Sequence, residues 1–134
     1  MKFMEVTQTD MVHVEQIDNQ HIRLADDLNS IYDSVMACDK KKTFQLLNEL
    51  IEHLEEHFTT EEKMMKEYRF SGYISHKLEH DRFYNQILKT TEKYGNDKEA
   101  FGLEQLKGVK KWFFNHIELN DRKCADYFIE KGIS

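Results

Sequence analysis

The stretch FQLLNELIEHLEEHFTTEEKMM, residues 44–65, decides the fold class. Its apolar residues recur every three or four positions, which is typical of one face of an α-helix. That face carries Phe44, Leu47, Leu50 or Ile51, Leu54, His57, Glu61 and Met64 or Met65. His57 and Glu61 are four residues apart, so they lie one turn above each other on the apolar side. The stretch therefore predicts a long helix whose buried face carries two potential metal ligands.

Three further helices flank this one in the sequence. Asp18 is placed to cap the first, and Ser71-Gly72 separates the second from the third. The expected inward residues are His21, Leu24, Leu28, Ile31 and Val35 in the first helix, Tyr73, His76, His80, Phe83, Ile87 and Tyr94 in the third, and Leu103, Leu106, Val109, Phe113 and His116 in the fourth. Short breaks are expected at residues 38–42 and 94–97, with Asn96 and Glu99 forming a capping box.

Four helices with short connections predict an all-α fold, an up-down-up-down four-helix bundle. Residues 1–17 precede the first helix as an N-terminal arm, and residues 125–129 are expected to form a short C-terminal helical extension or a separate short helix. The sequence has no proline and five glycines, which favours long uninterrupted helices. With 134 residues, the chain is expected to form one domain over residues 1–134, with nothing left for a signalling or DNA-binding module.

Composition limits the classes of partner. A formal net charge of −6 without a basic stripe argues against binding to nucleic acid. No run of 18 apolar residues exists, so no membrane span is expected, and no secretory signal is visible. Cys38 and Cys124 fit neither a zinc motif nor a disulfide framework, so a cytoplasmic location is expected.

Every predicted helix places a histidine on its apolar face. Taken one at a time, these are ordinary features: His21 fits a surface position, and His57 with Glu61 fits a surface pair. Six or seven such groups converging inside one bundle are hard to explain without a cation, because buried imidazoles and carboxylates need partners. We therefore interpret the set as a metal site.

The donor set also bears on the metal. Five imidazoles and two carboxylates exceed what one tetrahedral zinc ion takes, and mixed nitrogen and carboxylate ligands suit iron or manganese, with histidine enrichment favouring iron. Seven donors fit two ions that share Glu61 and one more acid. The sequence has no Glu-x-x-His motif of ferritin-like proteins and no His-Glu-x-x-His motif of zinc proteases, which leaves a nitrogen-rich dinuclear centre.

Four motifs together resemble the hemerythrin family. They occur in the family's order, cover nearly the whole chain and are specific as a set. The motifs are Ile17-Asp18-x-Gln20-His21, His57-Phe58-x-x-Glu61-Glu62-x-x-Met65, His76-x-x-x-His80 and Trp112-x-x-x-His116-Ile117-x-x-x-Asp121.

The resemblance implies a non-haem di-iron site with an oxo or hydroxo bridge. It implies that His76, His80 and His116 hold the first iron, and that His21 and His57 hold the second. It further implies that Glu61 and Asp121 bridge the two irons and that the second iron keeps one position open for O2. Leu24, Phe58, Trp112 and Phe113 adjoin these ligands, so they are expected to line the O2 pocket, a role compatible with ordinary core packing.

Asp121 fits a regular helix poorly. It follows His116 by five residues, about 140° around an ideal helix. Either the helix is distorted there or the side chain reaches across at a helix end. Val6, His13 and Cys124 depart from residues common in the family, and we expect Cys124 to fill space as a small hydrophobe.

The leading functional prediction is reversible O2 binding by a carrier, store or local O2 supply that is not an enzyme. The alternatives are an oxygen-sensor subunit, a di-iron peroxide or nitric-oxide reductase, and an iron-handling protein. O2 is the expected ligand, and the expected partner is an unidentified electron donor or an O2-consuming enzyme.

Overall fold

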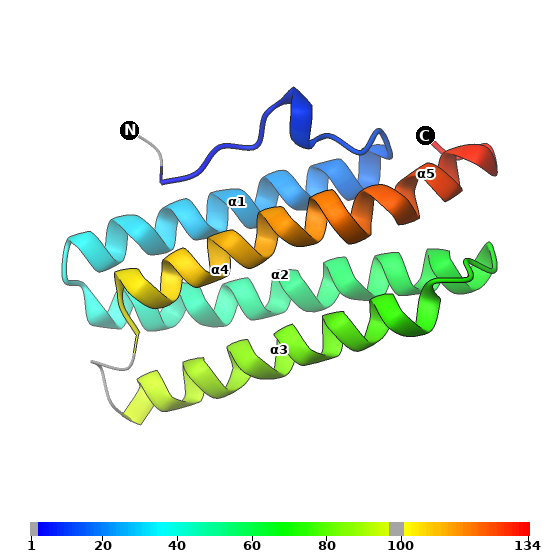
Figure 1. Ribbon diagram of the computed structural model, residues 1–134. Helices are drawn as coiled ribbons and strands as arrows, with labels where there is room; N and C mark the ends of the chain where they lie inside the picture. Colours follow the sequence, from blue (N-terminus) through cyan, green and yellow to red (C-terminus); the bar gives the residue numbers. More distant parts are fainter. Residues whose placement is uncertain (1–2, 97–100) are drawn as a thin grey trace.

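The computed structural model describes residues 3–96 and 101–134, and within these ranges it contains helices and no strand. The elements in chain order are η1 (Gln8–Asp10), α1 (Glu15–Met36), α2 (Lys40–Glu67), α3 (Tyr73–Asn96), α4 (Leu103–His116), η2 (Ile117–Asp121) and α5 (Arg122–Glu130). The chain reverses direction at each connection from α1 to α4, and α5 continues the line of α4 (Figure 1). The predicted four-helix bundle with an arm and a C-terminal helical extension is confirmed.

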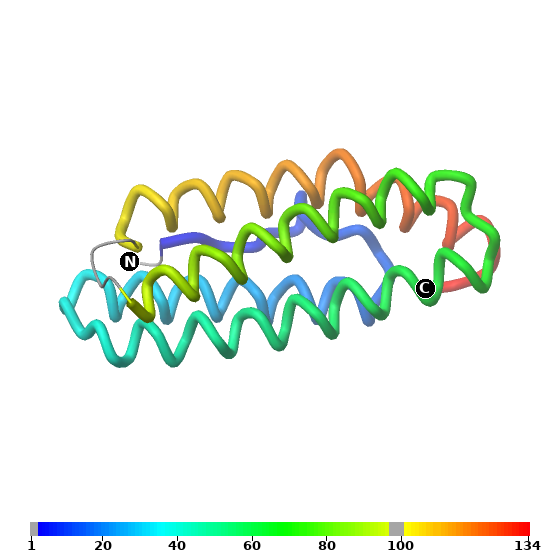
Figure 2. The backbone as a smooth tube through the Cα atoms, turned by 90° about the horizontal axis from the view of Figure 1, so that it is seen from below, coloured from blue at the N-terminus to red at the C-terminus, as the bar shows by residue number. Residues whose placement is uncertain are grey.

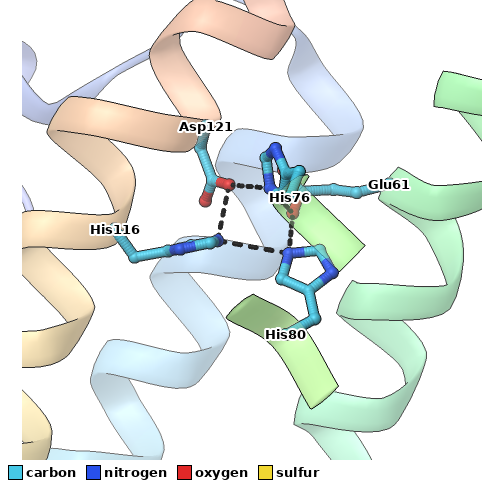
Figure 3. Close-up of side chains that lie close together, drawn as sticks. All are labelled: Glu61, His76, His80, His116 and Asp121. Atoms are coloured by element: carbon cyan, nitrogen blue, oxygen red, sulfur yellow. Dashed lines mark hydrogen bonds and ion pairs between the residues drawn. The ribbon is translucent and has the colours of Figure 1, made fainter. Parts of the chain in front are cut away.

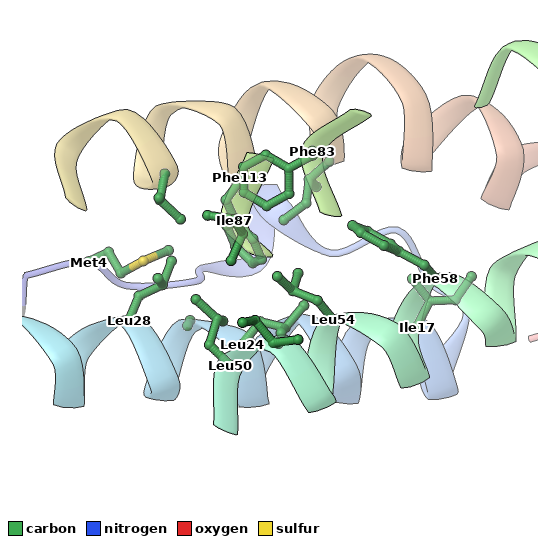
Figure 4. Close-up of a cluster of buried hydrophobic side chains, with 14 of the residues drawn as sticks. Met4, Ile17, Leu24, Leu28, Leu50, Leu54, Phe58, Phe83, Ile87 and Phe113 are labelled. Carbon is green, nitrogen blue, oxygen red and sulfur yellow. The ribbon is translucent and has the colours of Figure 1, made fainter. Parts of the chain in front are cut away.

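The four long helices lie side by side along one axis (Figure 2). α1 packs on α2, α2 packs on α3, and α1 also packs on α4. Each helix buries one apolar stripe, and together these stripes form a continuous core in which Leu28, Leu50 and Leu54 are almost completely buried (Figure 4). Among the helices of residues 3–96 and 101–134, none is long and apolar enough to cross a membrane.

The helix boundaries differ from the prediction at two connections. The break at residues 38–42 is shorter than expected, because Asp39 caps α2 by accepting a hydrogen bond from the Lys42 amide at 3.1 Å. α3 continues through Asn96, so the loop predicted at residues 94–97 is helical over its first three residues. Tyr94 is buried and its hydroxyl donates to the Lys40 carbonyl, which holds the end of α3 against the start of α2. The prediction that Asn96 caps the fourth helix is wrong, because Asn96 is the last residue of α3 and Gly102 is the N-cap residue of α4. Its predicted partner Glu99 lies outside the described residues.

The N-terminal arm is fixed to the bundle by hydrogen bonds. Asn29 of α1 exchanges two with the Met4 backbone, at 2.9 and 3.0 Å. Lys110 of α4 donates to the Phe3 carbonyl at 2.7 Å, and Arg122 of α5 donates to two arm carbonyls. The arm therefore lies along α1 and α4 and closes that side of the bundle (Figure 1).

Asp18 performs a different task from the one predicted. α1 begins three residues earlier, at Glu15, with Val14 as its N-cap residue. The Asp18 carboxylate instead accepts hydrogen bonds from the amides of Val12 and His13, at 2.8 and 3.0 Å. It therefore joins the arm to the first turn of α1, one turn before His21 of the same helix.

Asp18→Ala is expected to lower the free energy of unfolding by about 1–3 kcal/mol, because two amides lose a charged acceptor. Urea unfolding of the metal-free protein measures this. Asp26→Ala, on the exposed face of the same helix, is the matched control and should change stability by less than about 0.5 kcal/mol. An equal loss in both variants would contradict the role given to Asp18.

Candidate metal centre

Seven potential ligands from four helices and one π-helical turn meet inside the bundle. They are His21 of α1, His57 and Glu61 of α2, His76 and His80 of α3, His116 of α4, and Asp121 of η2. Every one is buried, with at most 4 % of its surface exposed. The ligand atoms form two groups that share Glu61 and Asp121: one adds His76, His80 and His116, and the other adds His21 and His57.

Asp121 lies at the centre of the cluster. One of its oxygens, Oδ1, is 2.9 Å from Nε2 of His116 and 3.1 Å from Nε2 of His76. Its other oxygen, Oδ2, is 2.8 Å from Nε2 of His21. Figure 3 shows Asp121 directed between the imidazoles from above, with Glu61 entering from α2. The carboxylate therefore faces histidines of both groups.

Glu61 is fully buried, and neither of its oxygens accepts a hydrogen bond from any residue that the structure describes. Its Oε1 lies 3.1 Å from Nε2 of His80 and 3.4 Å from Nε2 of His57, in directions unsuited to hydrogen bonding. Within the same described ranges, Nε2 of His57 likewise has no hydrogen-bond partner. Polar atoms that are buried without partners are costly, and a cation among them would satisfy these atoms together. The donor set therefore fits a metal.

A distortion of the helix brings Asp121 to the cluster. Between α4 and α5, residues Ile117–Asp121 form a π-helical turn. In a π-helix each backbone hydrogen bond spans five residues, so side chains five apart lie above one another. Asp121 therefore lies over His116 on the inner face, which resolves the conflict between their spacing and a regular helix in favour of a distorted helix.

Three of the imidazoles are held by a hydrogen bond on the ring nitrogen that faces away from the cluster. Nδ1 of His57 bonds to Gln20 Oε1 at 2.7 Å, Nδ1 of His80 to Glu62 at 2.9 Å, and Nδ1 of His116 to Glu79 at 2.8 Å. Such partners fix the ring orientation and leave Nε2 available as a ligand.

The sequence did not assign the orienting roles of Gln20, Glu62 and Glu79. A signal was present, because each is adjacent to a predicted ligand in the chain: Gln20 to His21, and Glu62 to Glu61. The three-dimensional pairing still crosses between helices, since Gln20 of α1 holds a histidine of α2. Adjacency alone therefore identifies the polar residues but not their partners.

A small apolar cavity borders the cluster. Its volume is about 10 Å³, and its walls include Leu24, Phe58, Trp112 and Phe113, the four residues expected there. Leu54 and Ile117 also line it, and the sequence did not single them out for this role. The histidines at its edge are His21, His57 and His116. Both histidines of the smaller ligand group therefore border the cavity.

Two residues near the cluster take no direct part in it. His53, one turn before His57, bonds to Asp27 at 2.5 Å instead of to a cluster residue. Cys124 is completely buried, and burial raises the pKa of its thiol far above the usual range. The thiol therefore stays protonated, in keeping with the space-filling role expected for it.

The two carboxylates control the protonation of the metal-free cluster. Burial disfavours the charged forms of His116 and His76, but the Asp121 carboxylate and Glu61 outweigh it and raise their pKa values to about 10 and about 9. Burial and the charge of Asp121 oppose ionisation of Glu61, yet the surrounding histidines lower its pKa to about 2. Without metal, protons bound to the histidines thus supply the positive charge that the carboxylates require.

Comparisons with known proteins identify the family. Residues 12–127 match the family model described as the hemerythrin HHE cation-binding domain. The chain belongs to the hemerythrin family. A bacteriohemerythrin of Aquifex aeolicus is 36% identical over 116 residues, which cover 84% of this chain and 85% of that relative. One from Clostridium acetobutylicum is 30% identical over 118 residues, covering 84% of this chain and 92% of the relative.

Solved hemerythrin structures share the fold. The wild-type structure superposes with a TM-score of 0.88 at 23% identity, covering 92% of this chain and 96% of that one. A leucine-to-alanine variant of a hemerythrin superposes with a TM-score of 0.90, also at 23% identity, over 95% of this chain and 98% of that one. This hemerythrin domain therefore contains a buried cluster able to bind a cation, in the fold of the solved hemerythrins.

The metal-free protein is expected to lose stability as the pH rises from 7 to 10. The pKa values of His76 and His116 are higher in the folded chain than the value of about 6.5 in an unfolded one. Their stabilising effect is complete below about pH 6.5 and is lost as the pH rises through the folded values. Urea unfolding of chelator-treated protein across this range measures the loss.

His116→Gln should flatten this dependence on pH, whereas His13→Gln in the exposed arm should preserve it. A metal-free wild-type protein whose stability stays constant or increases between pH 7 and 10 would contradict the proton-for-metal exchange.

Proposed function

We propose that residues 1–134 form one hemerythrin domain that binds O2 reversibly at a non-haem di-iron centre, as an oxygen carrier, store or local supply. The observation that carries this proposal is the apolar cavity of about 10 Å³ beside the ligand group with fewer donors. A volume of that size is at the lower limit for a single water-sized molecule, so it excludes anything larger than a diatomic gas unless the walls move. The described residues of its wall offer such a molecule no ionisable side chain other than the candidate ligands.

The two ligand groups support a division between two ions. His76, His80 and His116 would hold the first iron, and His21 and His57 the second, with Glu61 and Asp121 shared by both. The first group has five donors and the second has four. The second ion would therefore keep the open position, next to the cavity.

The donor chemistry favours iron. A structural zinc site takes four ligands in a closed tetrahedron, fewer than either the seven residues together or the five of the first group. Calcium and magnesium prefer oxygen ligands and would leave five imidazoles without a purpose. When bound, a pair of ferrous ions would supply two electrons to O2, one from each iron, and would recover them when O2 leaves.

The protein contributes orientation and exclusion of water. Hydrogen bonds that oxygens of Gln20, Glu62 and Glu79 accept hold three imidazoles in place, so the site is organised before a ligand arrives. Leu24, Phe58 and Phe113 cover the cavity with apolar surface, which keeps water from competing for the open position. Both contributions serve binding and release rather than the conversion of a substrate.

The names of the two relatives described above agree with this proposal, since both are bacteriohemerythrins. We propose that the domain works in the cytoplasm and exchanges O2 with an O2-consuming enzyme, or receives electrons from a donor that keeps the irons reduced. An oxygen-sensor subunit would use the same centre, whereas a peroxide or nitric-oxide reductase or an iron-handling protein would differ in the measurements below.

Purified protein is expected to contain two irons per chain. After reduction and exposure to air it should develop charge-transfer absorption that disappears under vacuum and returns with air. Metal analysis and optical spectra measure both quantities. Irreversible bleaching on the first exposure would instead support a reductase, an iron content that exchanges without any O2-dependent spectrum would support iron handling, and one zinc per chain would end the di-iron proposal.

His57→Ala is expected to reduce the iron content from two ions to about one per chain, because it removes one of four donors at the second position and none at the first. Iron analysis after gel filtration measures the loss. His53→Ala is the matched control, since His53 lies one turn away on the same helix and pairs with Asp27. Loss of both ions in His57→Ala, or an equal loss in the control, would contradict the assigned division.

A further inference from the structure

A second and larger cavity lies between α3 and α4, apart from the metal pocket. Its volume is about 290 Å³. The apolar part of its wall comes from Phe83, Ile87, Phe101, Val109 and Trp112. An apolar cavity of about half this volume is sufficient to bind benzene. The space between α3 and α4 is therefore large enough for a molecule with one ring.

The sequence keeps this space open at Gly108. A Cβ atom added there would meet no atom of residues 3–96 or 101–134 within 4 Å. Glycine inside an exposed helix costs about 1 kcal/mol relative to alanine, so helix stability does not account for it. Gly108 is exposed and lines the cavity, so the missing side chain leaves the cavity open at this point of its wall.

The remaining wall limits the chemistry of an occupant. Gln86, Thr90 and Gln105 supply uncharged polar groups, and Gln105 already accepts a hydrogen bond from the Gly102 amide. The described residues that line the cavity include no charged side chain. A charged occupant would lose its hydration without gaining a partner, whereas an uncharged molecule with one hydroxyl would be satisfied. The wall therefore fits a small uncharged molecule with an apolar body.

Trp112 connects this cavity to the metal centre. It lines both the large cavity and the small pocket beside the cluster. Its ring stacks on Phe83 with centroids 3.7 Å apart and an interplanar angle of 6°. It also stacks on His116, with centroids 4.5 Å apart and an angle of 12°. Three nearly parallel rings thus lead from the wall of the cavity to a candidate metal ligand.

We propose that the cavity between α3 and α4 is a binding site for a small uncharged molecule with an aromatic or aliphatic body and one hydroxyl group, and that Trp112 transmits its presence to the metal centre. Binding in this cavity does not depend on the O2 proposal. An occupant that restricts Trp112 restricts the ring packed on His116, so it alters how firmly that imidazole is held. The site would make the behaviour of the metal centre depend on a second ligand.

Benzyl alcohol is the probe, because it combines one ring with one hydroxyl. Calorimetric titration of the metal-loaded protein should show saturable binding with a Kd of about 1 mM or tighter. Trp112 is the only tryptophan in the chain, so its fluorescence in the metal-free protein should change over the same range of concentration. Absence of saturable binding in the wild-type protein would overturn the proposal.

Gly108→Leu should weaken binding at least about tenfold, because the new side chain occupies the cavity. Gly108→Ala should keep the affinity within about twofold, and so should Lys107→Leu, which adds a leucine at an exposed position next to Gly108. Equal affinity in wild-type and Gly108→Leu proteins, or an equal loss in Lys107→Leu, would show that the probe binds elsewhere.

The connection through Trp112 has its own measurement. Saturating benzyl alcohol should change the rate at which a chelator removes iron from the wild-type protein by about fivefold, and should leave the rate unchanged in Gly108→Leu. Saturable binding with no change in the rate would overturn the transmission to the metal while leaving the O2 proposal untouched. The O2 proposal is tested separately, by the charge-transfer absorption that should disappear under vacuum and return with air.

Discussion

Two carboxylates buried among five imidazoles are the constraint on which the rest of the structure depends. Glu61 and Asp121 are inaccessible to solvent, and ionised groups in such a place require positive charge nearby. Without metal, the imidazoles supply it by holding protons, which is why the pKa values of His76 and His116 are raised. Two divalent metal ions would provide more positive charge than the protonated imidazoles do. The interior of the bundle therefore requires a positive charge beside Glu61 and Asp121, from bound protons or from bound metal.

This constraint explains where the bundle is regular and where it is not. Apolar layers enclose the cluster on both sides along the axis: Leu24, Leu54 and Phe83 on one side, and Ile17 with Phe128 on the other. Regular helices carry six of the seven ligands. The two ligands on α2 are four residues apart in the sequence, and so are the two on α3. The π-helical turn is the local exception, because only a longer turn aligns Asp121 with His116.

Much of the architecture could be predicted because it follows from periodicity. The three- and four-residue spacing of apolar residues identified all four helices, and histidines on those faces indicated a common interior. Asp18 shows the limit: its type and position suggested an N-cap, but its carboxylate binds amides of the arm, a tertiary contact that local spacing does not encode. Gln20 shows the same limit, since its partner His57 is on another helix. Asp121 was assigned by the resemblance, and the backbone distortion that brings it to the cluster has no signature in its residue types.

Trp112 lines both cavities and so connects the cluster to its surroundings. A metal site enclosed by aliphatic side chains alone would be isolated, whereas the stack of Phe83, Trp112 and His116 gives one ligand a rigid link to the space between α3 and α4. Glu79 holds the other nitrogen of His116, so this imidazole is fixed by a ring on its face and by a carboxylate at its edge. Movement of either contact changes the direction of Nε2. His80 is held in the same way, by the stacked ring of Phe58 and by Glu62, but Phe58 does not line the larger cavity. His116 is therefore the histidine that the ring stack connects to the space between α3 and α4.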